Sequence, residues 1–525
     1  VATRQTMLSS AQSLVSRFAS FESQLNQIRE GVNTQLVSSV NEVNTYAKQI
    51  ASLNDVIEQS FSTTGNPPND LMDQRDQLVA ELSKQIKTTV VPQGQGSYNI
   101  FIGNGLPIVV GKESYPLTTA NSPTDPTRIE VAYQSAAKTT VLGTSSLSGG
   151  VIGGLVQFRE ESLDAIQNQV GQIAIALAGT FNTQHAQGFD KNGNPGGALF
   201  NLPAPTVTSN SNNTGSAELT AAIVDPSAVT SSNYRVQYDG SNYKIMRTSD
   251  KYEQTFSSLP QTVDGVSIGL ASGSINAGDS FMVRPTQNAA SGLTLAIQDV
   301  SKLALGGPVL SSTAGIGNTG AGVISNVQAS SNYAASPLSS TLQFTYNSGL
   351  PNTLTLAPAS QPVVVTYGGV STTYPAGTPI TYTSGATISV GAVSMVLSGA
   401  PANGDTFSLA PSANSGPGDN RNGLLLANLQ SAGNVALLGS NSKNTYPTAF
   451  AQLVSGVGNK SRELTISGNA ESKALELTTA AMQSQSGVNL DEEATNLIRY
   501  QQAYQAAGKM MQIASELFDV LLQLG

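Results

Sequence analysis

The chain has 525 residues, which is long enough for two to four domains with separate hydrophobic cores. Charged residues make up 11% of it and the net charge is −9, which argues against nucleic acid or an anionic membrane as a partner, because both attract clustered Lys and Arg. It has no cysteine, which excludes disulfides, thiolate metal sites and a Cys nucleophile. No stretch reaches the roughly 18 apolar residues of a membrane span, and the opening Val1-Ala-Thr-Arg lacks a signal-peptide pattern.

Residues 3–58 show an apolar repeat every seven residues, which predicts one long helix that packs against partners. Two stripes precede Gly31, and a third resumes one residue out of phase: Met7, Leu14, Phe21 and Ile28; Ala11, Phe18, Leu25 and Val32; then Leu36, Val43, Ile50 and Ile57. After the loop at 65–69, a second amphipathic helix begins at Asp70, with Leu71, Leu78 and Leu82 towards the core. We interpret its charged residues as a solvated face with intrahelical pairs rather than a catalytic cluster.

Residues 88–145 change to strand periodicity. The runs 98–102 and 106–110 flank the turn Gly103-Asn-Gly, which predicts a hairpin, and residues 128–133 and 139–142 read as further strands. A helical pattern returns over 151–187. The glycines at 149, 150, 153 and 154 match no phosphate-binding motif, so we expect them to allow close approach of strand and helix backbones.

The only histidine, His185, cannot build a His-rich metal site, and no catalytic triad can be assembled around it. We expect it to lie at a helix end. The run Asp190-Lys-Asn-Gly-Asn resembles the start of a calcium loop, but Pro195 and Asn201 stand where such a loop needs Gly and Glu. A hydrated turn is the preferred interpretation, and no metal or cofactor is expected.

Residues 190–417 are rich in Gly, Ser, Thr, Asn and Pro and alternate in short strands, as all-β domains do. The run 266–281 parallels 393–407, and Tyr234-Arg-Val-Gln-Tyr parallels Leu342-Gln-Phe-Thr-Tyr. The sequence therefore predicts two related β modules with a boundary near 325.

A further helix is expected over 446–484, followed by a C-terminal helix from about Leu490, with Asn489 as its cap and Glu492 reaching back. Apolar residues recur along this helix at sevenfold spacing, which predicts a packing seam that one shallow contact cannot hold. Docking on the chain's own domains remains the alternative. The residues that we expect to form an assembly interface are Leu490, Leu497, Tyr504, Met511, Leu517, Phe518, Leu521 and Leu524.

Four segments carry a family resemblance: Ser486 to Ala507, Ser148 to Glu160, Phe181 to Asp190, and Gly418 to Gln430. Together they resemble the flagellar hook-associated protein 1 family of bacteria, the first hook-filament junction proteins. The resemblance implies a self-assembling structural subunit. Its partners would be further copies in a ring, the hook protein, the second junction protein, and an export chaperone on the C-terminal segment. It also implies an extracellular location on the flagellum, reached through the flagellar export apparatus without a cleaved signal peptide. The start of the chain resembles an interior part of the family's first domain, so we expect a preceding segment that pairs with the C-terminal helix, and the conformation of 486–525 without it stays open.

These observations predict a multi-domain α + β protein in which a discontinuous rod of long helices carries a small β-hairpin region, two inserted all-β modules and a C-terminal heptad helix. The expected parts are the first part of the rod (1–189, with β structure at 88–145), β modules at 190–325 and 326–417, the return of the rod (418–485), and an axial-core helix (486–525). Another flagellar axial subunit, such as the hook protein or the second junction protein, is the nearest alternative, and a surface adhesin that uses the β modules is a more distant one. An enzyme is not expected.

Overall fold

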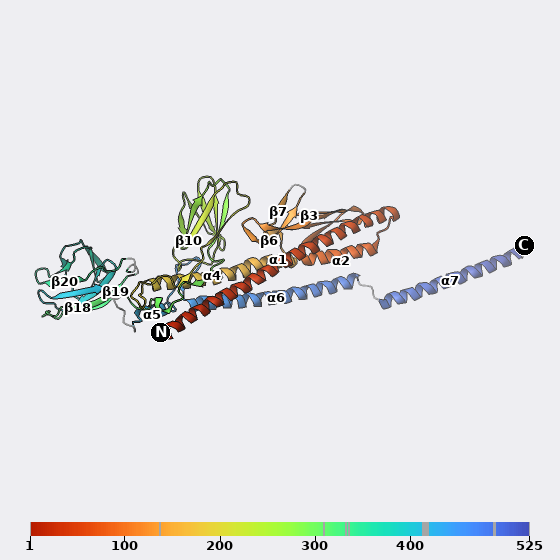
Figure 1. Cartoon of the computed structure of the whole chain (residues 1–525). Coiled ribbons are helices and arrows are strands. Elements are labelled where there is room, and N and C mark those ends of the chain that lie inside the picture. The colour runs from red at the N-terminus through yellow and green to blue at the C-terminus, as the bar shows by residue number, and fades with distance from the viewer. Residues whose placement is uncertain are drawn as a thin grey trace. The chain divides into compact units, whose positions relative to one another are not determined.

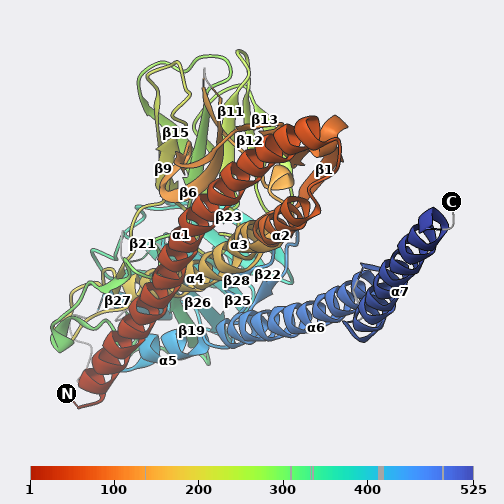
Figure 2. The same cartoon turned by 90° about the vertical axis from the view of Figure 1, so that its right-hand side faces the viewer.

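The computed structural model describes residues 2–135, 138–307, 310–330, 333, 336–411, 419–486 and 490–523. The chain divides into two compact units, Val1–Val454 and Ser455–Gly525. Figure 1 and Figure 2 show its elements coloured from the N-terminus to the C-terminus. The helices are α1 (Ala2–Thr64), α2 (Asn69–Gln85), α3 (Gly150–Gln157), α4 (Asp164–Ala186), α5 (Arg421–Asn428), α6 (Tyr446–Ser486) and α7 (Leu490–Gln523).

The predicted long N-terminal helix is confirmed as α1, which lies beside α2 in both views. Before Gly31 its seam agrees with the prediction only in part, since Leu25 of the second predicted stripe is buried. Leu8 and Val15 are buried there, whereas Phe21 and Ile28 of the predicted stripe are exposed. Beyond Gly31 the predicted stripe of Leu36, Val43, Ile50 and Ile57 is fully buried. The sevenfold spacing thus identified the helix, but neighbouring stripes compete for the core and spacing alone does not choose between them.

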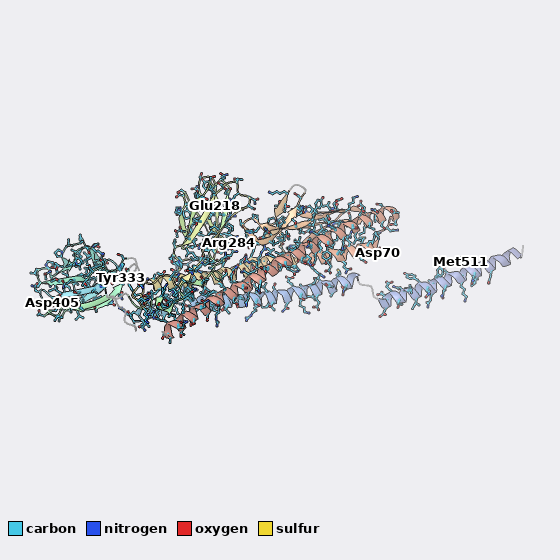
Figure 3. The ribbon with its side chains drawn as sticks, in the orientation of Figure 1. Asp70, Glu218, Arg284, Tyr333, Asp405 and Met511 are labelled. Atoms are coloured by element: carbon cyan, nitrogen blue, oxygen red, sulfur yellow. The ribbon has the colours of Figure 1, made fainter. Side chains whose placement is uncertain are left out.

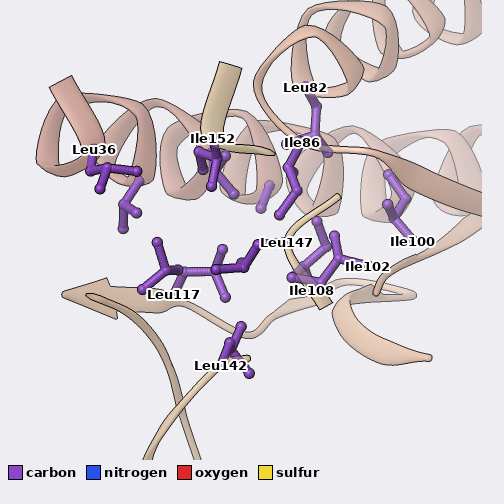
Figure 4. Packing of buried hydrophobic residues seen from close by; sticks show 14 of the residues in the cluster. Leu36, Leu82, Ile86, Ile100, Ile102, Ile108, Leu117, Leu142, Leu147 and Ile152 are labelled. Atoms are coloured by element: carbon purple, nitrogen blue, oxygen red, sulfur yellow. The ribbon is translucent and has the colours of Figure 1, made fainter. Parts of the chain in front are cut away.

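Two small antiparallel sheets cover the C-terminal half of α1. The first has the order β1-β2-β3-β4 and contains the predicted hairpin, in which Ile102 pairs with Leu106; the second has the order β5-β6-β7. Their apolar faces pack with α1 and α2 around Leu36, Leu82, Ile100 and Leu117 (Figure 4). The strands are β1 (Thr88–Pro92), β2 (Tyr98–Ile102), β3 (Leu106–Val110), β4 (Glu113–Ser114), β5 (Leu117–Ser122), β6 (Asp125–Gln134) and β7 (Thr139–Val141).

The expected solvated face of α2 is wrong for one residue. Arg75 is fully buried, its guanidinium lies 3.3 Å from the centre of the Tyr98 ring, and it donates a hydrogen bond to the carbonyl of Gly96. An Arg can be buried in this way because the aromatic face and a carbonyl together replace its hydration. The predicted intrahelical pairing is found in Lys84 and Glu81, at 2.6 Å.

The glycines before α3 serve close packing, as predicted. A Cβ on Gly150 would lie 2.5 Å from the carbonyl carbon of Gln85, and one on Gly153 would lie 2.6 Å from the carbonyl oxygen of Leu147. Gly154 differs, since nothing lies within 4 Å of its Cβ position. Between α3 and α4 the chain forms a π-helical turn, Phe158–Leu163.

The first β module consists of two sheets with the orders β13-β12-β11-β16-β9 and β10-β15-β14. Its core is built around Tyr234, Val266 and Phe281, and Ile175 of α4 joins it. The strands are β9 (Thr206–Ser209), β10 (Glu218–Ile223), β11 (Tyr234–Tyr238), β12 (Tyr243–Arg247), β13 (Glu253–Phe256), β14 (Gln261–Val263), β15 (Val266–Ser272) and β16 (Ser280–Arg284). Before and after it, β8 (Phe200–Asn201) pairs with β17 (Thr294–Leu295).

The second β module also has two sheets, with the orders β24-β21-β20-β27-β18 and β19-β26-β25-β22-β23. Its core includes Phe344, Met395, Phe407 and Tyr333. Phe189, which precedes the module in the chain, packs against this core, with its ring centre 6.1 Å from that of Tyr333. The strands are β18 (Leu310–Ala314), β19 (Val323–Ala329), β20 (Leu342–Asn347), β21 (Thr353–Ala357), β22 (Val363–Tyr367), β23 (Val370–Tyr374), β24 (Ile380–Thr381), β25 (Ala386–Val390), β26 (Val393–Ser398) and β27 (Thr406–Pro411). The last pair of strands, β28 (Val435–Ala436) and β29 (Lys443–Asn444), precedes α6.

The predicted internal repeat is confirmed, because the two modules share one strand arrangement. In each, the first strand pairs with the last, β9 with β16 and β18 with β27, and the second strand pairs with the one before the last, β10 with β15 and β19 with β26. The second module adds the hairpin β22–β23 at the end of one sheet.

Each module has a buried aspartate at the corresponding position, just before its last strand, and its carboxylate accepts hydrogen bonds from backbone amides. Asp279 accepts hydrogen bonds from the backbone amides of Asn276, Thr214 and Gly215 at 2.8, 2.8 and 3.1 Å. Its counterpart Asp405 (Figure 3) accepts from Ala402, Thr319 and Gly320 at 2.8, 2.9 and 3.0 Å. These backbone hydrogen bonds, first those from Asn276 and Ala402, hold the pKa of each carboxyl below its ordinary value.

His185 lies in the last turn of α4, as predicted, and is fully buried. Its Nε2 accepts a hydrogen bond from the amide of Ala304, and its Nδ1 lies 2.8 Å from the carbonyl oxygen of Gly197. Because one nitrogen accepts, the ring is neutral with its proton on Nδ1. The loop that follows is a closed turn rather than a hydrated one, since Asp190 is buried and accepts from the amides of Asn192 and Asn194.

Candidate assembly surfaces

The C-terminal helix α7 presents large apolar side chains to solvent. Leu497, Tyr504 and Met511 of the predicted seam are 69%, 83% and 75% exposed, and their sevenfold spacing places them on one face of the helix. The backbones of Leu490, Leu517, Phe518 and Leu521 belong to α7, but their side chains lie outside the described residues. Leu524 and the predicted cap Asn489 lie outside them altogether.

The part of α6 in the same unit, Ser455–Ser486, is also open. Two ion pairs form within the helix, Lys473 with Glu476 at 2.6 Å and Lys460 with Glu463 at 3.4 Å. Its large apolar side chains are exposed: Val457, Leu464, Ile466, Leu475, Leu477 and Met482. A helix with this much exposed apolar area needs partners, because each such side chain gains about 1.5–3 kcal/mol on burial.

The first unit contains an apolar groove of about 840 Å³. It is formed by α1, α4, α5 and the first turns of α6, and Arg17 is its one charged lining residue. Its apolar wall includes Met7, Leu14, Phe18, Phe21, Phe181 and Phe450. The sequence analysis did not predict this groove. It did identify the stripe of Met7, Leu14 and Phe21 that lines it, but interpreted that stripe as part of a packed seam.

An ionic network fixes α1 to β6 and to the start of α4. Arg128 binds three carboxylates, those of Glu130 at 2.6 Å and of Glu160 and Asp164 at 2.8 Å. Arg29 of α1 binds Asp164 at 2.8 Å, and the buried Arg159 of the π-helical turn binds Glu130 at 2.6 Å. Sequence reasoning missed this network, because α1, β6 and the start of α4 are far apart in the chain and only the fold brings them together.

The same crossing buries Glu22 of α1, which accepts a hydrogen bond from Gln167. Desolvation by burial raises the pKa of the Glu22 carboxyl, against the opposing effects of Gln167 and Arg29. Desolvation likewise lowers the pKa of Arg159. The side chains of this cluster bind one another across α1, β6 and the start of α4. The cluster therefore has a structural role.

Among the described residues, no three His, Cys, Asp or Glu side chains lie together so as to hold a metal ion. In the described parts of the chain, no helix is both long enough and apolar enough to span a membrane.

Three family models match the chain. The flagellar hook-associated protein FlgK helical domain matches residues 1–200, and the D2-like domain of flagellar hook-associated protein 1 matches residues 208–285. The C-terminal model of the flagellar basal body rod proteins FlgEFG matches residues 480–524. Long helices, an inserted β module and this C-terminal segment together define a structural component of the bacterial flagellum.

Individual relatives show which family of flagellar proteins the chain is similar to. Flagellar hook-associated protein 1 of Salmonella typhimurium (strain LT2) is 32% identical over 531 aligned positions, which cover 100% of this chain and 77% of the relative. The Escherichia coli (strain K12) protein of the same name is 31% identical with the same coverage. The solved structure of the flagellar hook junction protein FlgK from Burkholderia pseudomallei is similar with a TM-score of 0.84 and 35% identity, covering 93% of this chain and 90% of that one. The chain belongs to the flagellar hook-associated protein 1 family.

Proposed function

We propose that this protein is a structural subunit at the junction between the hook and the filament of the bacterial flagellum. Membership of the hook-associated protein 1 family supports this role. The single structural observation that carries it is the exposed apolar face of α7, because a subunit whose helices end in unpaired apolar faces is built for assembly.

The interface that we propose runs along the seam of α7 and comprises Leu490, Leu497, Tyr504, Met511, Leu517, Phe518, Leu521 and Leu524. The described members, Leu497, Tyr504 and Met511, support it by their common face and exposure. The heptad packing of this helix is part of the proposal. Its partners would be a helix of the same subunit or those of neighbouring subunits, as in a coiled coil.

The finer assignments follow from the family. We infer that copies associate in a ring, with the hook protein on one side and the second junction protein on the other. We also infer that an export chaperone holds the C-terminal segment before assembly, and that the protein reaches the outside of the cell through the flagellar export apparatus without a cleaved signal peptide. The role is mechanical and involves no reaction.

We also propose the domain limits expected from the sequence, with one change. We propose a boundary between the β modules before Leu310 rather than near 325, and the pairing of β18 with β27 of the second module supports it. The rod would comprise 1–189 and 418–485, and the axial-core helix 486–525.

The test uses full-length protein added to isolated hooks that carry no filament, with the hook tips imaged by electron microscopy. We expect density that caps the distal tip and that is lost when residues 486–525 are deleted. Tyr504→Ala combined with Met511→Ala should also abolish capping, because about 3–6 kcal/mol of apolar burial is removed from each subunit.

The matched control is Gln502→Ala combined with Lys509→Ala, which changes exposed residues on the opposite face of the same helix. It should cap as the unmodified protein does. Bare tips with the unmodified protein would refute the junction role, and equal loss from both pairs would refute the proposed seam.

A further inference from the structure

Methionine is the side chain of this protein that oxidises most easily. The chain has 8 methionines but no cysteine and no tryptophan, and its one histidine is buried. The methionine thioether is a soft, polarisable group that peroxides convert to a sulfoxide, and the rate of this reaction follows the exposure of the sulfur. The exposure of each methionine therefore decides where oxidation occurs.

The structure separates the methionines into two groups. Met395 is fully buried in the core of the second β module, and the other four of the first unit are partly buried: Met7, Met72, Met246 and Met282. The remaining ones are exposed and belong to the second unit: Met482 of α6 at 62%, and Met510 and Met511 of α7 at 70% and 75%. The most exposed methionines thus lie on the helix that we propose as the assembly interface, where Figure 3 labels Met511.

Met510 and Met511 are neighbours on one side of α7. Met511 follows Tyr504 and Leu497 at sevenfold spacing, so it belongs to the proposed seam. Met510 follows Ala503 at the same spacing and lies about 100° around the helix from Met511, so it borders the seam. One oxidant can therefore change two adjacent positions of the surface that has to pack.

Oxidation by hydrogen peroxide is a two-electron step that needs no further reactant. The thioether sulfur attacks one peroxide oxygen, so that an S–O bond forms and the O–O bond breaks. The second oxygen leaves as hydroxide and takes the proton of the first, which gives water. Sulfur is oxidised and peroxide is reduced, and the product is an uncharged but strongly polar sulfoxide.

A sulfoxide at these positions opposes the packing of the seam. In the free chain its oxygen is hydrated, because both side chains are exposed. When the seam packs, that water is removed, and an apolar heptad surface supplies no hydrogen-bond donor to replace it. Burial therefore penalises the oxidised helix and favours the reduced one.

We propose that Met510 and Met511 form an oxidation site, at which conversion to the sulfoxide blocks assembly and enzymatic reduction restores it. This inference rests on the assembly role proposed above for the seam of α7. It gives that surface a reversible redox control, because the sulfur atoms are open to peroxide in the free chain and are protected once the seam is packed.

The first measurement locates the site and needs no hook. The full chain is treated with dilute hydrogen peroxide, and the sulfoxide at each methionine is followed over time by mass spectrometry of tryptic peptides. Cleavage after Lys509 places Met510 and Met511 in one peptide, whose fragment ions distinguish them. We expect both to oxidise roughly tenfold faster, or more, than the buried Met395. Equal rates at all three would overturn the site.

The second measurement tests the effect on assembly. Protein that has been oxidised and freed of peroxide is added to isolated hooks, beside untreated protein and oxidised protein repaired with methionine sulfoxide reductases. We expect oxidation to raise the concentration for half-maximal capping roughly tenfold or more, and repair to restore it. Undiminished capping by protein fully oxidised at Met510 and Met511 would overturn the proposal.

Two variants assign the effect to α7. Met510→Leu combined with Met511→Leu keeps the side-chain volume but cannot form the sulfoxides, so oxidation should not reduce its capping relative to its own untreated sample. The matched control Met482→Leu removes the exposed methionine of α6 and should remain as sensitive as the unmodified chain. Protection by Met482→Leu, or an equal loss in the double variant, would overturn the assignment. Failure of the untreated chain to cap would instead refute the junction role, and the oxidation rates would still decide the site.

Discussion

At the scale of single residues, buried polar side chains connect segments that are distant in the chain, and His185 is the clearest example. Its two ring nitrogens connect α4 to the backbones of Gly197 and Ala304. Asn422 of α5 then donates to the carbonyl of Ala304 at 2.6 Å and accepts from Gln184 at 2.7 Å. The histidine thus joins segments on both sides of the first β module. Its position at the helix end was predictable from the sequence, but its partners were not, because Ala304 is remote in the chain.

Desolvation lowers the pKa of His185 below 6.5, and protonation would also place a second N–H against the amide of Ala304. At a pH just below 6.5, His185 therefore binds a proton in the unfolded chain but stays neutral in the folded chain. We predict that the free energy of unfolding falls as the pH drops below about 6.5, with a slope of at most about 1.4 kcal/mol per pH unit. Urea denaturation between pH 7.5 and 5.5 measures this.

His185→Leu cannot take a proton, so its stability should be flat over this range. At pH 7.5 it should be less stable by about 2–4 kcal/mol, because the amide of Ala304 and the carbonyl of Gly197 lose their partner. With only one histidine in the chain, an unchanged slope in the variant would show that another group titrates.

At the scale of elements, the sequence predicted those whose signal is local. The hairpin at 98–110 has its turn glycines within its own sequence, and the spacing of Leu36, Val43, Ile50 and Ile57 is contained in one helix. The two stripes predicted before Gly31 were only partly right, because burial there depends on α4 and on residues 290–303, which are distant in sequence. Arg75 was misread for the same reason, since Tyr98 lies on another element. The heptad packing of α7 remains a prediction.

The start of α3 provides a matched test of close packing. Gly150 has a φ of 63° and Gly154 lies in the same helix with open space around it. Gly150→Ala should destabilise the first unit by about 2–4 kcal/mol, because the strained φ adds to a clash with the backbone of Gln85. Gly154→Ala should stabilise it by about 0.5–1 kcal/mol through helix propensity. Thermal unfolding of the two variants measures both, and effects of equal sign would contradict the packing described here.

At the scale of the whole molecule, the two β modules are insertions that the helical framework accommodates. The second begins with β18 and ends with β27, and Leu310 pairs with Pro411, so the chain enters and leaves the module at one point. Residues 310–411 should therefore be replaceable by a short Gly-Ser linker. Hydrogen exchange at the buried part of α1 around Leu36 should stay as slow as in the unmodified chain. Phe189, which packs against the second module, should become more exposed. Fast exchange throughout α1 would show instead that the framework depends on the module.

The pairing of first and last strands also bears on how such a protein changes over generations. A segment whose two ends lie side by side can be copied, lengthened or lost in a single in-frame genetic event. The amino-acid sequence of the flanking helices is not changed by such an event. The carboxylate turns of Asp279 and Asp405 and the common pairing of first and last strands make the two modules structurally alike. The added hairpin and the near-complete absence of charge are the features in which the second module differs from the first. Such a change in a β module leaves the sequence of the flanking helices, and hence the surfaces that they offer to neighbours, untouched.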